Sequence, residues 1–248
     1  MRCQPNAWRQ VYNWLNSEQA CLLCDGRCAG PLPICSPCKA ELPWLEQQCR
    51  ICALPLPAAA MVCGECQNKP PYFDHVQTPW HYGFPVDALI TRFKHHGKWP
   101  LGRLLGSLLS HHLQNAFAQG LPRADLLLPV PLGKQRLRQR GFNQAGMLAD
   151  WLHTHLQLPS QNHLLRRARE TDAQQDLDAA ARQRNLRNAF ALTDPSRVKH
   201  KHVALVDDVL TTGATANSLA RLLKKAGARR VDVYCLARTP KPGGFCPQ

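Results

Sequence analysis

The chain has 248 residues, and its composition, 44% apolar and 19% charged, is ordinary for a globular protein and excludes a disordered one. The formal net charge is +14, and the whole excess lies after residue 75, because residues 1–75 hold six Lys or Arg and six Asp or Glu. Such a charge favours anionic ligands such as a pyrophosphate-bearing sugar, a nucleotide or a nucleic acid, although a soluble basic surface without a ligand would also explain it.

The N-terminal stretch, residues 1–20, carries no assignable chemistry. It lacks the uninterrupted apolar segment of a signal peptide, and no run in the chain approaches the roughly 18 apolar residues of a membrane span. We therefore expect a cytoplasmic protein without a membrane span. In that compartment thiols stay reduced and available to metal.

Cysteine is concentrated at one end of the chain, since ten of the 12 cysteines lie before residue 67. Eight of them form four C-x-x-C pairs, and ten residues separate the first pair from the second and the third from the fourth. Two such turns direct four thiolates to one point, which predicts two zinc sites. Equal spacing favours ligation in sequence order, in which the two sets are Cys21, Cys24, Cys35, Cys38 and Cys49, Cys52, Cys63, Cys66. A cross-braced pairing, with ligands exchanged between the two sets, stays open. Disulfides are the alternative, which the lack of a visible secretion signal disfavours.

Two helices are expected after the cysteines. Residues 69–85 read as a linker, because the consecutive prolines of KPPY lock an extended chain. Apolar residues recur at helical spacing over residues 86–95 and again over about 101–117. The first helix leaves Arg92 and Lys94 on its polar side, and the paired histidines of both helices are interpreted as solvated rather than as metal ligands.

A basic loop is expected after the next strand. Residues 125–132 form an apolar run typical of a buried strand, and residues 145–156 are expected to form a helix. Between them lie four cations in seven residues: Lys134, Arg136, Arg138 and Arg140. Cations that follow a strand's carboxyl end lie on the edge where open α/β sheets bind ligands, so this loop is predicted to bind pyrophosphate. A solvated basic turn is the alternative.

Residues 165–190 are polar, rich in arginine and alanine, and poor in large apolar side chains. Such a segment would not pack as a core helix, and a long charged segment between two strands often forms a lid. The candidate ligand contacts in this flexible loop are Arg167, Arg169, Thr171, Gln174 and Arg182.

The stretch 203–215 has the order of a phosphate-binding junction. Residues 203–206 read as a strand buried on both faces, Asp207 and Asp208 follow it, and a hydroxyl-rich turn leads into a helix at 216–226.

At such a junction the helix N-terminus offers unpaired N–H groups and a positive dipole end, and Gly213 lets the backbone approach an anion closely. The two acids suit hydrogen bonds from a ribose diol. Acids that merely end a strand and a threonine that merely caps a helix are the alternative, which the combination of features disfavours. Residues 229–239 are expected to form a last strand, and residues 241–248 a disordered tail.

This stretch resembles the signature of the type I phosphoribosyltransferases, which bind 5-phosphoribosyl-1-pyrophosphate (PRPP). The resemblance implies that Asp207 and Asp208 hold the ribose hydroxyls, that Mg²⁺ accompanies PRPP, and that the flexible loop closes over it. It assigns the 5-phosphate to Thr211, Thr212, Gly213, Ala214 and Thr215. Thr211 stands where members that use hypoxanthine or guanine carry an aspartate, which disfavours those two bases as substrates.

The whole chain resembles the ComF family, whose members join an N-terminal zinc ribbon to a type I phosphoribosyltransferase-like domain. The motifs that carry this resemblance are CGEC-x2-KPPYFD at 63–74, PVPL-x4-LRQRGFNQA at 129–145, ETDAQQDL with ARQRNLRNAF within 170–190, and DDVLTTG at 207–213. The implied fold is α/β, a parallel sheet with flanking helices preceded by a small double zinc ribbon. The expected parts are an N-terminal segment at 1–20, the double ribbon at 21–68, the linker at 69–85, the phosphoribosyltransferase-like domain at 86–240 and the tail.

The function implied by this resemblance is the use of extracellular DNA as a nutrient, or natural competence, by a protein that binds PRPP. Single-stranded DNA and a helicase or other DNA-uptake protein are the expected partners. Two alternatives stay open: a working phosphoribosyltransferase in nucleobase salvage, with an unknown acceptor, and a zinc-ribbon adaptor that binds DNA or protein without catalysis. No catalytic residue can be assigned.

Overall fold

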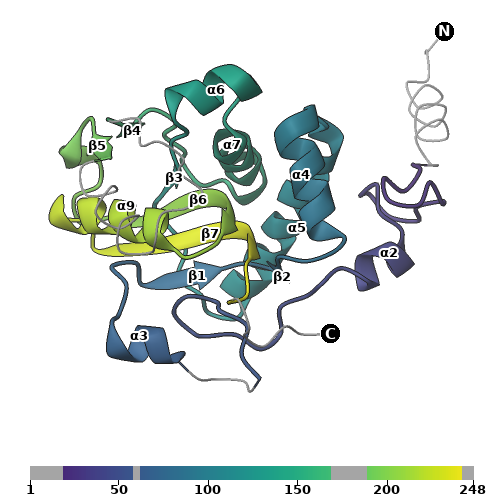
Figure 1. Ribbon diagram of the computed structural model, residues 1–248, viewed down its shortest axis with the longest axis horizontal. Helices are drawn as coiled ribbons and strands as arrows, with labels where there is room; N and C mark the ends of the chain where they lie inside the picture. Colours follow the sequence, from purple (N-terminus) through teal and green to yellow (C-terminus); the bar gives the residue numbers. More distant parts are fainter. Residues whose placement is uncertain (1–18, 58–61, 169–188, 242–248) are drawn as a thin grey trace, which may run out of the picture. The chain divides into compact units, whose positions relative to one another are not determined.

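The structure is a computed structural model that describes residues 19–57, 62–168 and 189–241 (Figure 1). The chain divides into two compact units, Met1–Leu42 and Pro43–Gln248. Among the described helices, none has the length and apolar character needed to cross a membrane.

The first unit contains the first two C-x-x-C turns. Ala20 and Arg27 form an antiparallel bridge, and the Cys21 N–H donates to the Gly26 carbonyl at 2.7 Å. The short helix α2, Ser36–Ala40, begins directly after Cys35 and buries none of its residues. Few apolar side chains are available for a core in this part of the chain, which agrees with folding that depends on metal.

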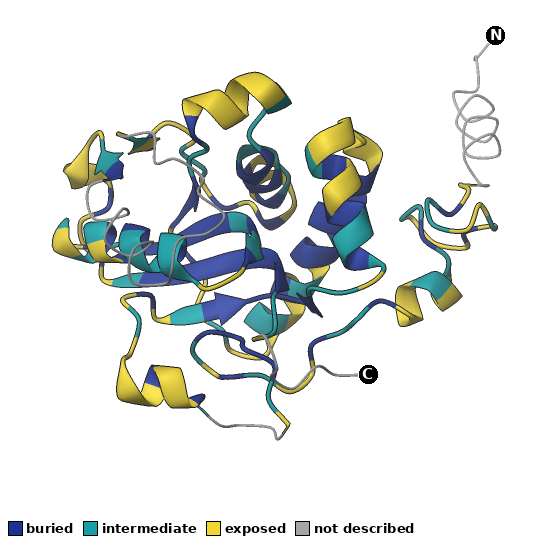
Figure 2. Ribbon diagram, in the orientation of Figure 1, coloured by how far each residue is buried: buried dark blue, intermediate teal, exposed yellow. Residues whose placement is uncertain are grey.

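The second unit is built on a parallel sheet with the strand order β1-β7-β6-β3, in which β2 also pairs with β7. The strands are β1 His75–Gln77, β2 Trp80–His81, β3 Leu126–Pro129, β6 His202–Leu210 and β7 Arg230–Arg238. Figure 2 shows β6 and β7 buried along most of their length, as expected for central strands of a parallel sheet.

Two of these strands lie in a stretch that we expected to be a linker. β1 and β2 fall within residues 69–85, and both pair with β7 in parallel register. Val76 and Trp80, a few residues beyond the prolines of KPPY, are fully buried. The drive to bury these side chains adds the stretch to the sheet.

Among the described helices of the second unit, four agree with the apolar spacing, one short helix begins directly after Cys63 in the second cysteine set, and one is an exception. They are α3 Gly64–Asn68, α4 Val86–His96, α5 Trp99–Ala118, α6 Lys134–Arg140, α7 Gln144–Leu156 and α9 Ala214–Lys225, with a 3₁₀ turn, η1, at Pro195–Arg197. The exception is α6, where we expected a loop. Its seven residues contain no helix breaker, Gly133 precedes them, and Gly141 ends the helix with a left-handed φ of 81°.

The strand that carries the two acids is longer than its four apolar residues suggested. Pairing of β6 with β7 continues to Leu210 opposite Arg238, so Asp207 and Asp208 lie inside the strand rather than after it. A separate antiparallel pair, β4 Leu165–Arg167 and β5 Phe190–Leu192, joins the two ends of the segment that was expected to form a lid.

The sheet has a different cover on each face. On one face, Leu219 and Leu223 of α9 share a hydrophobic core with the second set of four cysteines and with Val203 and Leu205 of β6. On the other face lie α5 and α7, and the Phe117 ring of α5 is 6.5 Å from that of Tyr234. The second ribbon is therefore part of the packed core of its unit.

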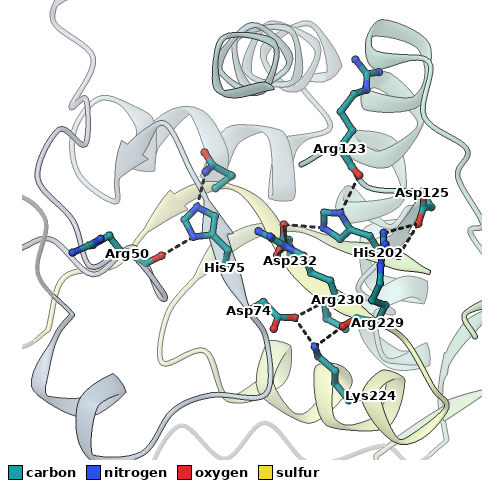
Figure 3. A network of polar contacts seen from close by, with 12 residues as sticks. Arg50, Asp74, His75, Arg123, Asp125, His202, Lys224, Arg229, Arg230 and Asp232 are labelled. Atoms are coloured by element: carbon teal, nitrogen blue, oxygen red, sulfur yellow. Dashed lines mark hydrogen bonds and ion pairs between the residues drawn. The ribbon is translucent and has the colours of Figure 1, made fainter. Parts of the chain in front are cut away.

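Buried polar groups align the amino ends of β6 and β7 (Figure 3). His202 Nε2 lies 2.8 Å from Asp232 Oδ2, and its Nδ1 lies 2.9 Å from the Arg123 carbonyl oxygen. Arg230 Nε donates to the same Asp232 carboxylate at 2.9 Å. His202 and Asp232 are buried and satisfied by one another and by the partly exposed Arg230. This edge of the sheet is therefore structural, and a ligand site is left to the carboxyl edge.

One glycine of α5 and one of α7 allow a test of how tightly α5 packs against α4. A Cβ at Gly102 would lie 2.5 Å from ring carbons of Phe93, whereas a Cβ at Gly146 in α7 would meet its nearest atom at 3.6 Å. Gly102→Ala is expected to lower the free energy of unfolding by about 1–3 kcal/mol through overpacking. Gly146→Ala, the matched control, should be neutral or raise it by up to about 1 kcal/mol. Chemical denaturation measures both, and equal stabilities of the two variants would contradict this packing.

Candidate ligand site and metal centres

Asp207 and Asp208 occupy successive positions near the carboxyl end of β6 and differ in exposure. Asp207 is half-buried, whereas the Asp208 side chain is only 6% exposed. Lys94 of α4 places its Nζ 2.9 Å from Asp208 Oδ2. Helical spacing put Lys94 on the polar side of its helix, so sequence reasoning missed it. Nothing in the local sequence indicates that this side faces a carboxylate 114 positions away (208 − 94).

The electrostatics of this pair favour a ligand that brings positive charge or hydroxyl donors. Burial and then the neighbouring Asp208 carboxylate raise the pKa of Asp207, and Lys94 opposes them. Two backbone amides help hold the carboxylates, since the Asp208 N–H donates to Asp207 Oδ1 at 2.9 Å and the Val209 N–H to Asp208 Oδ1 at 2.7 Å. The two adjacent carboxylates repel each other, and one ion-paired lysine offsets this repulsion only in part. A metal ion or the hydroxyl groups of a ribose would reduce the repulsion further.

The turn after β6 is open to an anion. Thr211 and Thr212 are exposed, and Gly213 takes a left-handed φ of 74° directly before α9. Thr212 Oγ1 accepts from the Ala214 N–H at 3.3 Å, and no side chain caps α9 from the N-cap position. The first-turn amides of this 12-residue helix therefore lie at its positive end, within reach of a phosphate.

The cations of the expected pyrophosphate loop are distributed along α6. Lys134, Arg136 and Arg138 are exposed, and Figure 2 shows the helix with an exposed surface. Arg140 is half-buried, and its Nη1 donates to Gln144 Oε1 at 2.5 Å. Burial lowers the pKa of Arg140 and the Asp208 carboxylate opposes this, so Arg140 lies within electrostatic reach of the acids. Of the four cations, Arg140 is the one that the structure relates to the acid pair.

Only one candidate of the flexible loop belongs to the described residues. Arg167 ends β4, and its guanidinium lies over the Phe190 ring, 5.7 Å from the centroid. The other four candidates lie outside the described residues: Arg169, Thr171, Gln174 and Arg182.

The eight paired cysteines form two sets in sequence order. Cys21, Cys24, Cys35 and Cys38 bring their sulfurs within 4.8 Å of one another, and so do Cys49, Cys52, Cys63 and Cys66. Cys24 Sγ lies 3.6 Å from Cys35 Sγ, and Cys52 Sγ lies 3.6 Å from Cys63 Sγ. Tetrahedral zinc with bonds of about 2.3 Å sets sulfur atoms about 3.8 Å apart, so both sets fit zinc.

The two sets differ in their surroundings. All four sulfur ligands of the second set are buried, whereas only Cys21 of the first set is. The first set belongs to the unit Met1–Leu42, and the second to the unit Pro43–Gln248. The ligand pairing is the one that equal spacing favoured, and the difference in burial could not be read from the repeat.

Comparison with known proteins gives two domains and several relatives. Residues 144–244 match the phosphoribosyl transferase domain, and residues 12–67 match the double zinc ribbon domain. The chain is 35% identical to Competence protein F of Haemophilus influenzae, over 83% of this chain and 90% of that protein. It is 36% identical to DNA utilization protein YhgH of Escherichia coli O157:H7, over 88% and 96%. Competence protein ComFC of Bacillus subtilis is 26% identical, over 88% and 95%.

These matches confirm the fold class that we expected, a parallel α/β phosphoribosyltransferase-like domain with a double zinc ribbon before it. They also confirm the family resemblance, because two relatives above 30% identity extend over most of both chains. The chain belongs to the ComF family of competence and DNA utilization proteins.

Proposed function

We propose that this protein binds PRPP with Mg²⁺ at the carboxyl edge of its sheet and serves in the use of external DNA. The observation that carries the proposal is the juxtaposition of the acid pair in β6 with the open N-terminus of α9. Asp207 and Asp208 lie six and five positions before Gly213, the N-cap residue of α9. Lys94 forms an ion pair with Asp208, and Arg140 is within electrostatic reach of the same carboxylate.

Each part of this edge suits one part of PRPP. The Asp207 carboxylate accepts hydrogen bonds from the ribose hydroxyls, while Lys94 holds Asp208 in place. The 5-phosphate binds the first-turn amides of α9 and the hydroxyls of the turn: Thr211, Thr212 and Thr215. Arg140, and with it the exposed cations of α6, faces the pyrophosphate. Mg²⁺, bound together with PRPP near Asp207, would neutralise part of the pyrophosphate charge.

The DNA part of the proposal rests on the relatives and on charge. The relatives are named for competence and for DNA utilization. The excess of +14 lies on the phosphoribosyltransferase side of the chain and is larger than one pyrophosphate requires. We therefore include single-stranded DNA, together with a helicase or another DNA-uptake protein, among its partners. We also propose a cytoplasmic location, because the reducing cytoplasm keeps the eight paired cysteines as thiols that can bind metal.

A second candidate function uses the same acids. A phosphoribosyltransferase in nucleobase salvage would release pyrophosphate from PRPP in the presence of a base. Thr211 disfavours hypoxanthine and guanine as that base, so a pyrophosphate-release assay should include the other nucleobases. If no base releases pyrophosphate and PRPP still binds, the site is a binding site.

Removal of the Asp207 charge should weaken PRPP binding. Asp207→Asn keeps the size of the side chain but loses two charged acceptors, so we expect a loss of about 1–3 kcal/mol in binding free energy, measured by calorimetry with Mg-PRPP. Asp150→Asn, on the exposed side of α7, is the matched control and should bind as the wild type does. Equal affinities of the two variants would contradict the ribose assignment.

The same variant has an opposite effect on stability. The pKa of Asp207 is raised above its unfolded value, so the protein takes up a proton on folding, and stability is lost as pH rises through the interval between the two values. Asp207→Asn should therefore melt above the wild type at about pH 8 and lose that advantage towards about pH 4. A melting curve at each pH measures this. A variant that melts lower at both would mean that weak PRPP binding reflects poor folding.

Growth on DNA tests the role of the PRPP site in the cell. A deletion strain with DNA as sole carbon source should fail to grow and should be restored by the wild-type gene. Asp207→Asn is expected to restore growth poorly, whereas Asp150→Asn should restore it fully. Full restoration by Asp207→Asn would separate DNA use from PRPP binding and favour the adaptor function of the zinc ribbons.

The basic helix α6 should bind single-stranded DNA in competition with PRPP. Arg136→Gln with Arg138→Gln is expected to lower the slope of log affinity against log salt by about 1.4, since each phosphate contact contributes about 0.7 for single strands. Lys199→Gln with Arg229→Gln, two exposed cations near the amino edge of the sheet, is the control. Fluorescence anisotropy with a labelled oligonucleotide measures both, and binding that Mg-PRPP does not reduce would contradict a shared surface.

A further inference from the structure

Arg238, at the end of β7, is a buried cation to which the assignment of PRPP contacts above gives no role. Its side chain is 5% exposed. Nε donates to the carbonyl oxygen of Cys52, a ligand residue of the second cysteine set, at 2.9 Å. Nη1 donates to the carbonyl oxygens of Leu210 at 3.0 Å and of Thr211. One guanidinium thus joins a turn that holds metal to the turn that follows the acids.

These contacts orient the amides of the phosphate-binding turn. In a trans peptide the N–H points away from the C=O of the preceding residue. When Arg238 binds the carbonyls of Leu210 and Thr211, the N–H groups of Thr211 and Thr212 therefore point to the opposite side. Because Thr211 and Thr212 are exposed residues, an anion can approach these N–H groups from the solvent.

The same cysteine turn is held at a second carbonyl. His75 Nδ1 of β1 donates to the Arg50 carbonyl oxygen at 2.6 Å, as Figure 3 shows. Gln77 Nε2 donates to His75 Nε2 at 2.7 Å, and His112 of α5 donates to Gln77 Oε1 at 3.1 Å. The turn 49–52 is therefore fixed to strands β1 and β7 through two of its carbonyls.

The residues that follow the second cysteine set also support the turn. The Phe73 ring lies 3.7 Å from the position that a Cβ on Gly213 would take. The Tyr72 N–H donates to Asn217 Oδ1 of α9 at 2.6 Å. The second cysteine set shares one hydrophobic core with Leu210 and with α9.

From these contacts we infer that the second zinc site is a structural part of the phosphate-binding site, with Arg238 as the positioning residue that links them. Metal closes the turn 49–52 around Cys49 and Cys52, and the Cys52 carbonyl then fixes the guanidinium that holds the carbonyls of Leu210 and Thr211. The role in PRPP affinity rests on the proposed function, whereas the link between metal and turn does not. The first zinc site, in the other unit, is not part of this link.

The test compares matched cysteine variants of the full-length protein. Cys66→Ser and Cys38→Ser remove the last ligand of the second and first set, and each should lose one of the two zinc ions, measured by metal analysis. Hydrogen–deuterium exchange should accelerate over residues 209–216 in Cys66→Ser and remain at the wild-type rate there in Cys38→Ser. Equal exchange of residues 209–216 in the two variants would overturn the inference.

Arg238 variants test the link between the second cysteine set and the phosphate-binding turn even if Cys66→Ser fails to fold. Arg238→Met should keep both zinc ions, accelerate exchange over residues 209–216 while β3 stays protected, and weaken Mg-PRPP binding by about tenfold or more through loss of the carbonyl contacts. Arg238→Lys, which keeps the charge but has a single donor group, should be intermediate. Unchanged exchange in Arg238→Met would refute the link.

The exchange measurement also separates this inference from the proposed function. If wild-type protein fails to bind Mg-PRPP, the proposed function is wrong, and the exchange rates of the variants still report on the link. If the wild type binds Mg-PRPP and Arg238→Met binds equally well with unchanged exchange, the inference is wrong and the proposed function stands.

Discussion

The parallel pairing of β6 with β7 is the constraint on which the other features depend. It continues to Leu210 opposite Arg238, beyond the apolar part of β6. Because the pairing extends this far, the two acids are held in a rigid strand rather than in a loop. The turn that leads into α9 therefore starts from a fixed position at the end of β6. Rigid elements hold ligand-binding groups with greater accuracy than loops do. The buried His202 and Asp232, together with the partly exposed Arg230, fix the register of the same two strands at their other end.

The site combines groups that oppose one another in the free protein. Burial and the adjacent Asp208 work against ionisation of Asp207, and one lysine serves both acids. Such an arrangement lowers the stability of the free protein until a bound ligand interacts with the two carboxylates. Groups arranged in this way are typical of binding sites and uncommon on surfaces that only keep a protein soluble. Lys94 and Arg140 come from helices at different places in the chain, so the arrangement exists only after folding.

The sequence indicated the candidate ligand and metal residues more readily than the residues that hold them in position. The turn and helix were expected at Gly213 and α9, where the structure has them, although the acids lie inside β6 rather than after it. The repeated spacing gave both cysteine sets, because such signals are local. Lys94 and Arg238 carried no such signal, since their partners lie far away in the chain. The loop expected at α6 was wrong because charge was weighted above helix propensity, and seven residues without a breaker are enough for two turns. β1 and β2 were missed because strands of three and two residues are too short to show a period.

The division between Leu42 and Pro43 separates two halves of what the sequence presents as one duplicated module. The second half shares its hydrophobic core with the sheet, so a change there is constrained by many neighbours at once. The first half holds few apolar side chains, and only one of its four paired cysteines is buried. Two copies of one ancestral ribbon would then evolve under unequal selection, with the second kept constant and the first free to acquire new surface residues. A fragment meant to retain the ligand site should begin at residue 43 rather than at residue 86.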